Sequence, residues 1–431
     1  MRRLTLRLVA LTVLTSPALA QPAIDGWLEA ARPGLLELYR ELHQNPELTF
    51  REVETAKRMA ARFEAAGLTV VRNVGGLGVV GLLENGDGPT VMLRADMDAL
   101  PVGERTSLPY ASKLRRVFAD GRVEGVMHAC GHDMHMTVLV GTIDYLAQHR
   151  DEWRGTLLAI GQPAEERGAG ARAMLEDGLF ERFPLPDFAL ALHVSPDLPT
   201  GTVGYRSGPM MANVDSVDIT VFGRGSHGAA PHLGIDPIVQ ASQLVLELQT
   251  IVSREIDPIE PAVVTVGAIH GGTKHNIISD RCDLQLTVRT LTDATRQKIH
   301  DAIRRKANAI ASAAGAREPL VSFSEGTPAL ANDAELTERV VRTLRATFDP
   351  ARVVEVPQAM VGEDFAQYGR HGVPICMLRL GTTSPERLAR YAAEGTAPPG
   401  LHSAGYYPDP DDSLRAGIVA LGSAALDLFG R

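Results

Sequence analysis

Cysteine is scarce in this sequence, because its 431 residues include only three. An odd count leaves at least one thiol outside any disulfide. Cys282 and Cys376 lie in apolar, strand-like runs, so we expect both to be buried in the core. Cys130 stands among histidines instead, which makes it a candidate for chemistry.

Long apolar runs are lacking after the first twenty residues. Residues 1–20 have the three parts of a secretory signal: a basic start, an apolar stretch at Leu8–Leu14 and a small-residue cleavage site ending at Ala20. We expect the mature chain to begin near Gln21 and to act in the periplasm or outside the cell, with a retained anchor as the alternative. No later stretch approaches the roughly 20 apolar residues of a membrane helix, so no membrane span is predicted.

Positive charge is also in short supply. The chain has 43 basic against 52 acidic residues, and loss of the signal with its three arginines leaves 40 against 52, a net charge of −12. Nucleic acid is therefore not an expected partner. A mature chain of about 410 residues exceeds what one hydrophobic core usually supports, so two domains are expected.

The two outer parts of the chain alternate between apolar, strand-like runs and helical stretches. The strand-like runs are 79–83, 91–95, 156–160, 188–192 and 373–380, and the helical stretches are about 134–148, 169–177 and 334–347. This pattern predicts an α/β domain with a sheet covered by helices on both faces. Thr49 to Glu52 has the spacing of a capping box and predicts the start of a helix that ends at Gly67.

The middle of the chain has a different pattern. Residues 217–221 alternate between apolar and polar side chains, as a strand with one wet face does. The following elements predict the order β-α-β-β-α-β, a ferredoxin-like unit. We place it as an insertion at about 207–326, between the parts 21–206 and 327–431 of one catalytic domain.

Residues able to carry chemistry follow successive predicted strands. Ligands of open α/β sheets gather beyond the carboxyl ends of the strands, so these residues should meet at one edge. They are Asp96 and Asp98 after the strand at 91–95, Cys130 and His132 in the next loop, Glu165 and Glu166 after 156–160, and His193 after 188–192.

An uncompensated cluster of this kind is electrostatically costly, and divalent cations relieve the cost. Carboxylate, imidazole and thiolate are the donor set for zinc and its neighbours. Each piece alone is a weak signal, because a Glu-Glu pair is usually a solvated face and a strand-end histidine is more often a hydrogen-bonded core residue. Their recurrence at successive strand ends predicts a metal site, and His128 and His135 could orient its ligands.

The runs Arg94–Pro101, His128–Asp133 and Gln162–Glu166 resemble those of a known family. It is the amidohydrolase branch of the aminoacylase and zinc-carboxypeptidase family, which includes hippurate hydrolases and auxin-conjugate (IAA-amino acid) hydrolases. The resemblance covers nearly the whole mature chain. It implies a zinc-peptidase-like catalytic domain with a mixed sheet, an inserted lid that also forms the contact of a homodimer, and hydrolysis of N-acyl amino acids or small peptides bearing a free carboxylate.

The resemblance also implies a role for individual residues. Two divalent ions (Zn, Mn, Co or Ni) are expected, with the ligands Cys130, His132, Glu166, His193 and His402. Glu165 matches the general base, Asp98 the carboxylate that orients a metal-bound group, His227 a histidine that stabilises the oxyanion in a neighbouring subunit, and Asn276 and Arg289 the residues that bind the substrate carboxylate. His232, in the same loop, is the alternative to His227.

Two positions depart from the family pattern. Asp96 stands where many relatives have a metal-binding histidine, so whether Asp96 or Cys130 bridges the two ions stays open. Arg167 stands where relatives often have glycine or a small residue. The motif Gly362–Phe365 also recurs in the family, and we expect it to have a structural role at the site rather than a catalytic one.

Two other classes of protein compete with this interpretation. A Cys-nucleophile amidase would use Cys130 and would remain active after metal removal. A periplasmic solute-binding protein for amino acid derivatives would bind its ligand without turnover and would not need Glu165 as a base.

Overall fold

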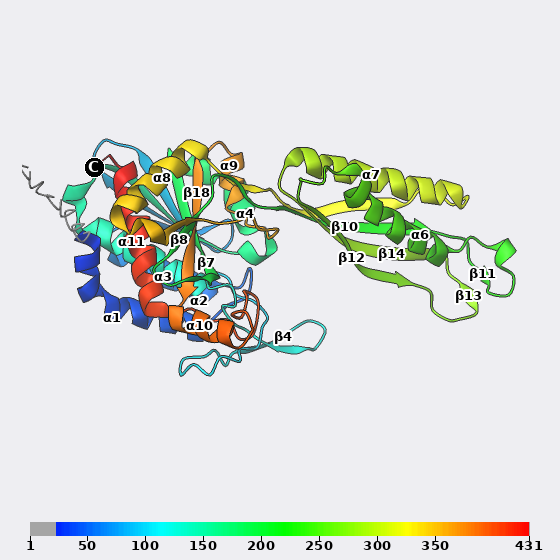
Figure 1. Cartoon of the computed structure of the whole chain (residues 1–431), viewed down its shortest axis with the longest axis horizontal. Helices are drawn as coiled ribbons and strands as arrows, with labels where there is room; N and C mark the ends of the chain where they lie inside the picture. The colour runs from blue at the N-terminus through cyan, green and yellow to red at the C-terminus, as the bar shows by residue number, and fades with distance from the viewer. Residues whose placement is uncertain (1–22, 431) are drawn as a thin grey trace, which may run out of the picture.

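The computed structural model describes residues 23–430. The molecule is elongated, with a large α/β body at one end and a smaller sheet unit at the other (Figure 1). We call residues 23–212 and 328–430 the body and residues 213–327 the smaller unit. The predicted signal, residues 1–20, lies outside the described residues and stays a prediction. Within residues 23–430, no helix combines the length and apolarity that crossing a membrane requires.

The body is built on an eight-stranded mixed sheet with the order β1-β2-β6-β3-β7-β18-β8-β17. The central strands β6, β3, β7 and β18 run parallel, and antiparallel neighbours flank them. The strands are, in sheet order, β1 (Thr69–Val74), β2 (Gly78–Asn85), β6 (Gly155–Gln162), β3 (Thr90–Asp96), β7 (Phe188–Pro199), β18 (Ile375–Thr383), β8 (Val203–Tyr205) and β17 (Val353–Glu355).

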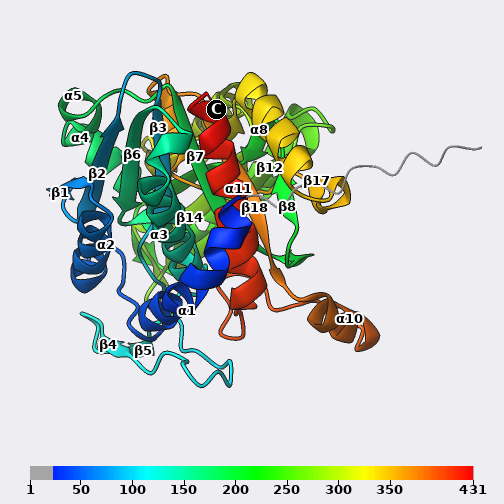
Figure 2. The ribbon, with the colours of Figure 1, turned by 90° about the vertical axis from the view of Figure 1, so that its left-hand side faces the viewer.

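Helices cover both faces of this sheet, as the sequence predicts (Figure 2). One face carries α1 (Ala23–Gln44), α2 (Val53–Ala65), α3 (His132–Gln148), α8 (Ala334–Thr347) and α11 (Pro410–Leu428). The other carries α4 (Gly170–Glu176), α5 (Leu179–Arg182) and α9 (Ala366–Arg370). The helix α10 (Pro385–Ala393) has no buried residue and projects from the rest of the body (Figure 2).

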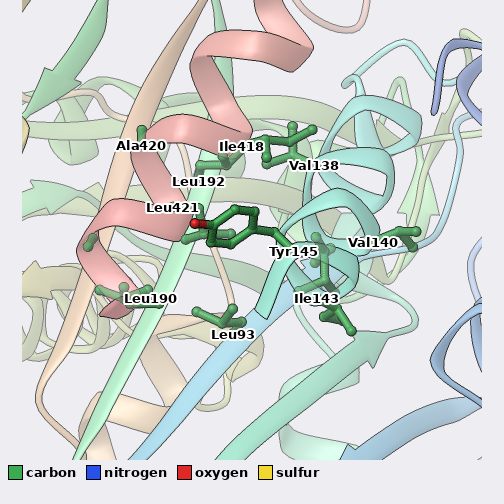
Figure 3. Packing of buried hydrophobic residues seen from close by; sticks show 14 of the residues in the cluster. Leu93, Val138, Val140, Ile143, Tyr145, Leu190, Leu192, Ile418, Ala420 and Leu421 are labelled. Carbon is green, nitrogen blue, oxygen red and sulfur yellow. The ribbon is translucent and has the colours of Figure 1, made fainter. Parts of the chain in front are cut away.

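Side-chain alternation along the strands divides the core in two. Leu93 of β3 and Leu190 of β7 face α3 and α11, where they pack with Val138 and Ile418 (Figure 3). Met92, the neighbour of Leu93, belongs to the opposite cluster under α4 and α9. Because successive residues of a strand point to opposite faces, the polar residues that follow Met92 at even steps must emerge on that second face.

The smaller unit has its own sheet and core. Its strands form an antiparallel sheet of order β12-β14-β10-β15, with two helices packed on it. Along the chain the elements are β10 (Asn213–Phe222), α6 (Pro237–Thr250), β12 (Ala262–Gly271), β14 (Arg281–Thr290), α7 (Asp293–Ala313) and β15 (Leu320–Thr327). A short ladder of β11 (Ser226–His227) and β13 (Ile277–Ile278) lies at the end far from the body (Figure 1).

The predicted capping box at Thr49–Glu52 is wrong. Helix α2 starts after Glu52, whose side chain makes no cap hydrogen bond to the helix. Glu52 instead accepts hydrogen bonds from the amides of Phe50 and Ala164, and the Thr49 hydroxyl donates to Asp98 at 2.7 Å. The side chains of Thr49 and Glu52 therefore connect this turn to Asp98 and to the loop that carries Glu165 and Glu166.

A buried histidine joins three segments of the body. His43, near the end of α1, lies 2.6 Å from Asp133 at the start of α3 and 3.1 Å from Glu104 in the loop that follows β3. Burial alone would lower the pKa of His43, but the hydrogen bonds to Asp133 and Glu104 raise it to about 9. The folded state thus holds a charged imidazolium that clamps α1 against α3.

We predict that this clamp stabilises the folded protein and that its contribution is lost at alkaline pH. Because the pKa of His43 is raised in the folded state, its contribution is fully present below its unfolded pKa of about 6.5 and is lost as the pH rises through about 9. His43→Gln should lower the free energy of unfolding by a few kcal/mol (roughly 2–3) at pH 6 and by much less at pH 9.5. Denaturant unfolding at both pH values measures this, with the exposed His371→Gln as control. An equal loss at both pH values would contradict the clamp.

Candidate metal centre

Strand register places four polar side chains side by side. Asp96 pairs with Gln162 across β3 and β6, and His193 pairs with Arg379 across β7 and β18. His193 lies two residues beyond Ala191, the partner of Arg94, so it is level with Asp96. In its own strand, each of these four residues is an even number of positions from a residue of the second core cluster. All four side chains therefore emerge on the same face of the sheet.

The five predicted ligands come together at this face. Cys130 Sγ lies 3.5 Å from His193 Nε2, and His402 Nε2 lies 3.4 Å from Glu166 Oε2. His132 Nε2 is 3.8 Å from Glu166 Oε1. Two groups of ligand atoms result, Cys130 with His132 and His193, and Cys130 with Glu166 and His402, each within 4.8 Å. The thiol of Cys130 belongs to both groups.

Several of these donor atoms are buried and have no hydrogen-bond partner in the part of the chain that the structure describes. They include both ring nitrogens of His132 and Oε1 of Glu166. His193 donates from Nδ1 to the carbonyl of Val194 at 2.9 Å, which leaves the lone pair of Nε2 facing Cys130. A ring fixed by a backbone carbonyl on one side and open on the other is the usual state of a metal-ligating histidine. The residues therefore fit divalent cations.

The same site contains a surplus of buried carboxylates around Arg94. Its guanidinium donates to Asp96 at 2.8 Å and to Glu363 and Asp364 at 2.9 Å each. Burial and Glu363 hold the pKa of Glu165 well above its usual range, and burial raises the pKa of Asp364 to about 7. One guanidinium thus leaves negative charge unbalanced, which favours added cations.

Asp98 positions the glutamate pair. Its carboxylate accepts from the backbone amides of Glu165 and Glu166, both at 3.1 Å, and from the Thr49 hydroxyl. Asp98 Oδ1 also lies 3.3 Å from His132 Nδ1. Ala164, just before the pair, has a left-handed φ of 56°, a conformation that costs energy for a residue with a Cβ. The two backbone hydrogen bonds to Asp98 therefore hold the turn in place, and the same carboxylate lies next to the imidazole of the ligand His132.

The two carboxylate oxygens of Asp96 are already in use. His135 Nε2 accepts from the Val194 amide, so Nδ1 carries the proton and donates to Asp96 Oδ1 at 2.6 Å. The other oxygen accepts from Arg94. His135 thus orients a carboxylate at the site, whereas His128, whose ring is buried, makes no hydrogen bond in the described residues. Burial lowers the pKa of His128 to about 4.

Glycine is needed between the two ligands Cys130 and His132. Gly131 has φ 74°, and a Cβ there would lie 2.7 Å from a methyl of Val194. Only glycine adopts this conformation without strain and leaves room for β7 to approach. The start of α3 can therefore present Cys130 and His132 to the same point.

A cleft of about 590 Å³ opens above the ligands, between the body and the smaller unit. Arg289 of β14 lines it together with Glu165, Glu166 and His402. The guanidinium of Arg289 donates to its neighbour Thr287 at 3.0 Å. The structure therefore brings the predicted carboxylate-binding arginine to the predicted ligands.

His227 and Asn276 are not brought to this cleft within one chain. Arg289 pairs with Val214 at the body end of β10, whereas His227 follows the other end of that strand, Phe222. Eight residues of strand separate these ends by roughly 25 Å. His227, His232 and Asn276 lie together near the β11-β13 ladder, where His227 and His232 are exposed.

One charged residue of the cleft was not predicted from the sequence. Arg379 was not singled out, although it lies on the site face of β18 and lines the cleft. An arginine inside the apolar run Ile375–Leu380 was the available signal, because strand cores rarely keep a charge without a function or a partner. Glu363 and Asp364 accept hydrogen bonds from Arg94 and also line the cleft, so their motif contributes to the wall of the site.

Comparison with known proteins adds a family to this geometry. The sequence profile of Peptidase family M20/M25/M40 matches residues 92–400. The chain is 38% identical over 349 residues to an N-acetyl-L-cysteine deacetylase of Bacillus subtilis, covering 81% of this chain and 80% of that protein. It is 43% identical over 278 residues to a hippurate hydrolase of Campylobacter jejuni, covering 64% and 70%.

A solved structure agrees with these similarities. It is a Bacillus subtilis protein described as a dinuclear metal-binding peptidase of the M20 family, with a TM-score of 0.76 and 32% identity. The alignment covers 93% of this chain and 99% of that protein. The likeness therefore extends over both the body and the smaller unit.

We predict that divalent cations stabilise the folded protein through these donors. A ligand that binds only the folded state raises the free energy of unfolding, by about 2.7 kcal/mol at a concentration 100 times its Kd. The melting temperature rises as a result. Zn²⁺, Mn²⁺, Co²⁺ or Ni²⁺ should raise the Tm of chelator-treated wild type in differential scanning fluorimetry. The shift should be largely lost in His132→Ala and kept in His371→Ala. An equal shift in both variants would place the binding elsewhere.

Proposed function

The chain belongs to Peptidase family M20/M25/M40, and from this premise we propose that it hydrolyses the amide bond of N-acyl amino acids or small peptides bearing a free carboxylate. One observation carries the proposal: four of the five metal-type donors, a buried glutamate and an arginine line a single cleft, and the fifth donor, His132, is buried within 4.8 Å of Cys130 and His193. The two relatives named above, a deacetylase of an N-acetyl amino acid and a hippurate hydrolase, are consistent with it.

Two divalent cations are proposed to be held by the five donors, with Cys130 shared between them. Its thiol lies in both ligand groups, whereas the oxygens of Asp96 are occupied by Arg94 and His135. When bound, such cations would supply the Lewis acidity that activates water and polarises an amide carbonyl.

Glu165 is the proposed general base. Its carboxylate lies 3.8 Å from His132 Nε2, next to the metal-type donors. The neighbouring Glu166 is the proposed glutamate ligand, which leaves Glu165 free to act as the base. Burial and nearby carboxylates raise the pKa of Glu165 above its usual range, so its carboxylate is a stronger base than that of an exposed glutamate. Glu165 would take a proton from the attacking water and pass it to the leaving amine nitrogen.

Arg289 is proposed to fix the substrate by its free carboxylate. A guanidinium fork can bind a carboxylate through two hydrogen bonds, and within residues 23–430 the side chain of Arg289 makes only one hydrogen bond, to Thr287. Its place on the smaller unit, across the cleft from Glu165, would hold the leaving amino acid beside the base.

His227 and Asn276 are proposed to act in the cleft of a partner subunit of a homodimer. Their distance from their own cleft requires a second chain if they touch substrate. The smaller unit offers a contact surface, because β12 is an edge strand and Ile238, Leu246 and Ile269 are 40%, 71% and 46% exposed. In this arrangement the smaller unit serves as both lid and dimer contact, and His227 donates a hydrogen bond to the oxyanion.

The alternative functions fit the site less well. Burial and the nearby Glu166 raise the pKa of the Cys130 thiol, whereas a nucleophilic cysteine needs a lowered pKa. A solute-binding protein has no use for an uncoordinated base in the position of Glu165.

We predict that Glu165→Gln abolishes turnover while leaving the ligand site intact. Loss of a general base typically lowers kcat by about 10²- to 10⁴-fold. Hydrolysis of a panel of N-acyl amino acids, with bound metal measured in the same samples, tests this. Glu181→Gln, on the surface of α5, is the control and should match wild type. A kcat for Glu165→Gln within a few-fold of wild type would exclude the assigned role.

A second prediction concerns action between subunits. Glu165→Ala and His227→Ala should each be nearly inactive alone, but mixed dimers contain one cleft with both residues intact. After unfolding and refolding of an equal mixture, random pairing restores about a quarter of wild-type activity. If the mixture stays as inactive as its components while wild type recovers under the same treatment, His227 does not act across a dimer.

A further inference from the structure

The cleft contains a positive charge that the proposed reaction does not use. Arg379 of β18 lies beside His193 in the sheet and lines the cleft with Cys130 and His402. Its guanidinium donates one hydrogen bond, from Nη2 to Ser195 Oγ at 3.3 Å. Within residues 23–430, it forms no ion pair with a carboxylate.

The surroundings balance this charge only partly. The Ser195 hydroxyl donates in turn to Asp197 at 2.7 Å, so the carboxylate of Asp197 is linked to Arg379 through an intervening hydroxyl. A guanidinium has five N–H donors, and most of those of Arg379 are left for a group inside the cleft.

The contrast with Arg94 shows that this is not the general pattern of the site. Both arginines lie on the same face of the same sheet. Arg94 is saturated by Gln162, Asp96, Glu363 and Asp364. Arg379 therefore differs from an arginine that only supports the structure, because it is both close to the ligands and available.

We propose that Arg379 binds a second acidic group of the substrate. The preferred substrates would then carry two anionic groups, with one held by Arg289 of the smaller unit and the other by Arg379 of the body. This inference rests on the proposed function and adds a substrate class to it. The second group belongs either to a dicarboxylic acyl part or to an acidic leaving amino acid.

Matched substrate pairs test this assignment. N-succinylalanine is compared with N-butanoylalanine, and N-acetylglutamate with N-acetylglutamine. Wild type should show a kcat/KM about 10- to 100-fold higher for the acidic member of at least one pair, the usual range for a hydrogen-bonded charge. The pair that shows the preference identifies which side of the amide carries the acid.

Variants of Arg379 then connect the preference to this residue. Arg379→Met should remove the preference, mainly through KM, and leave the neutral members within a few-fold of wild type. Arg379→Lys should keep part of it, because it retains the charge without the fork. Arg345→Met, an exposed arginine on α8, is the control. No preference in wild type, or an equal loss of kcat/KM on all four substrates in Arg379→Met, would overturn the proposal.

A binding measurement separates this inference from the proposed function. If wild type hydrolyses no N-acyl amino acid, the proposed function fails, and Arg379 can still be tested by ligand-induced stabilisation. Glutarate should raise the Tm of wild type more than butanoate does, and Arg379→Met should lose that difference. An identical response to both acids in wild type would overturn the role of Arg379.

Discussion

Arg94 and the carboxylates around it set the electrostatics on which the site depends. Its guanidinium binds Asp96, Glu363 and Asp364, and Glu165 lies beside the last two. One buried positive charge cannot balance these groups, and burial together with the nearby Glu363 and Glu166 raises the pKa of Glu165. The donors Cys130 and His132 stand at the edge of this negative region, so the charge that destabilises the carboxylates also attracts cations to the ligands.

The fold turns this electrostatic demand into a defined geometry. Alternation along the strands sends apolar side chains to α3 and α11, while Arg94, His193 and Arg379 emerge on the opposite face. Asp98 then fixes the glutamate pair through two backbone amides. The smaller unit contributes Arg289 across the cleft. Each contribution comes from a different segment, which explains why no single motif contains the whole site.

Much of this arrangement could be predicted because it depends on local patterns. The continuous apolar strands indicated the covered sheet, and the residues after them indicated the cluster with Cys130 and Glu166. Contacts set by tertiary structure were beyond the sequence: Thr49 caps no helix and binds Asp98 instead, and the separation of His227 from its own cleft follows from the length of β10. Arg379 was visible as a charge in an apolar strand, but its lack of a carboxylate partner required the structure.

The central claim is that this chain binds two cations at one point through residues from distant segments. Anomalous diffraction from crystals grown with Mn²⁺ or Zn²⁺, with data above and below the absorption edge, tests it most directly. The account predicts two anomalous peaks flanking the Cys130 sulfur, with His132 and His193 on one side and Glu166 and His402 on the other. Peaks only at other positions, or full-occupancy binding that leaves these five side chains uncoordinated, would contradict it.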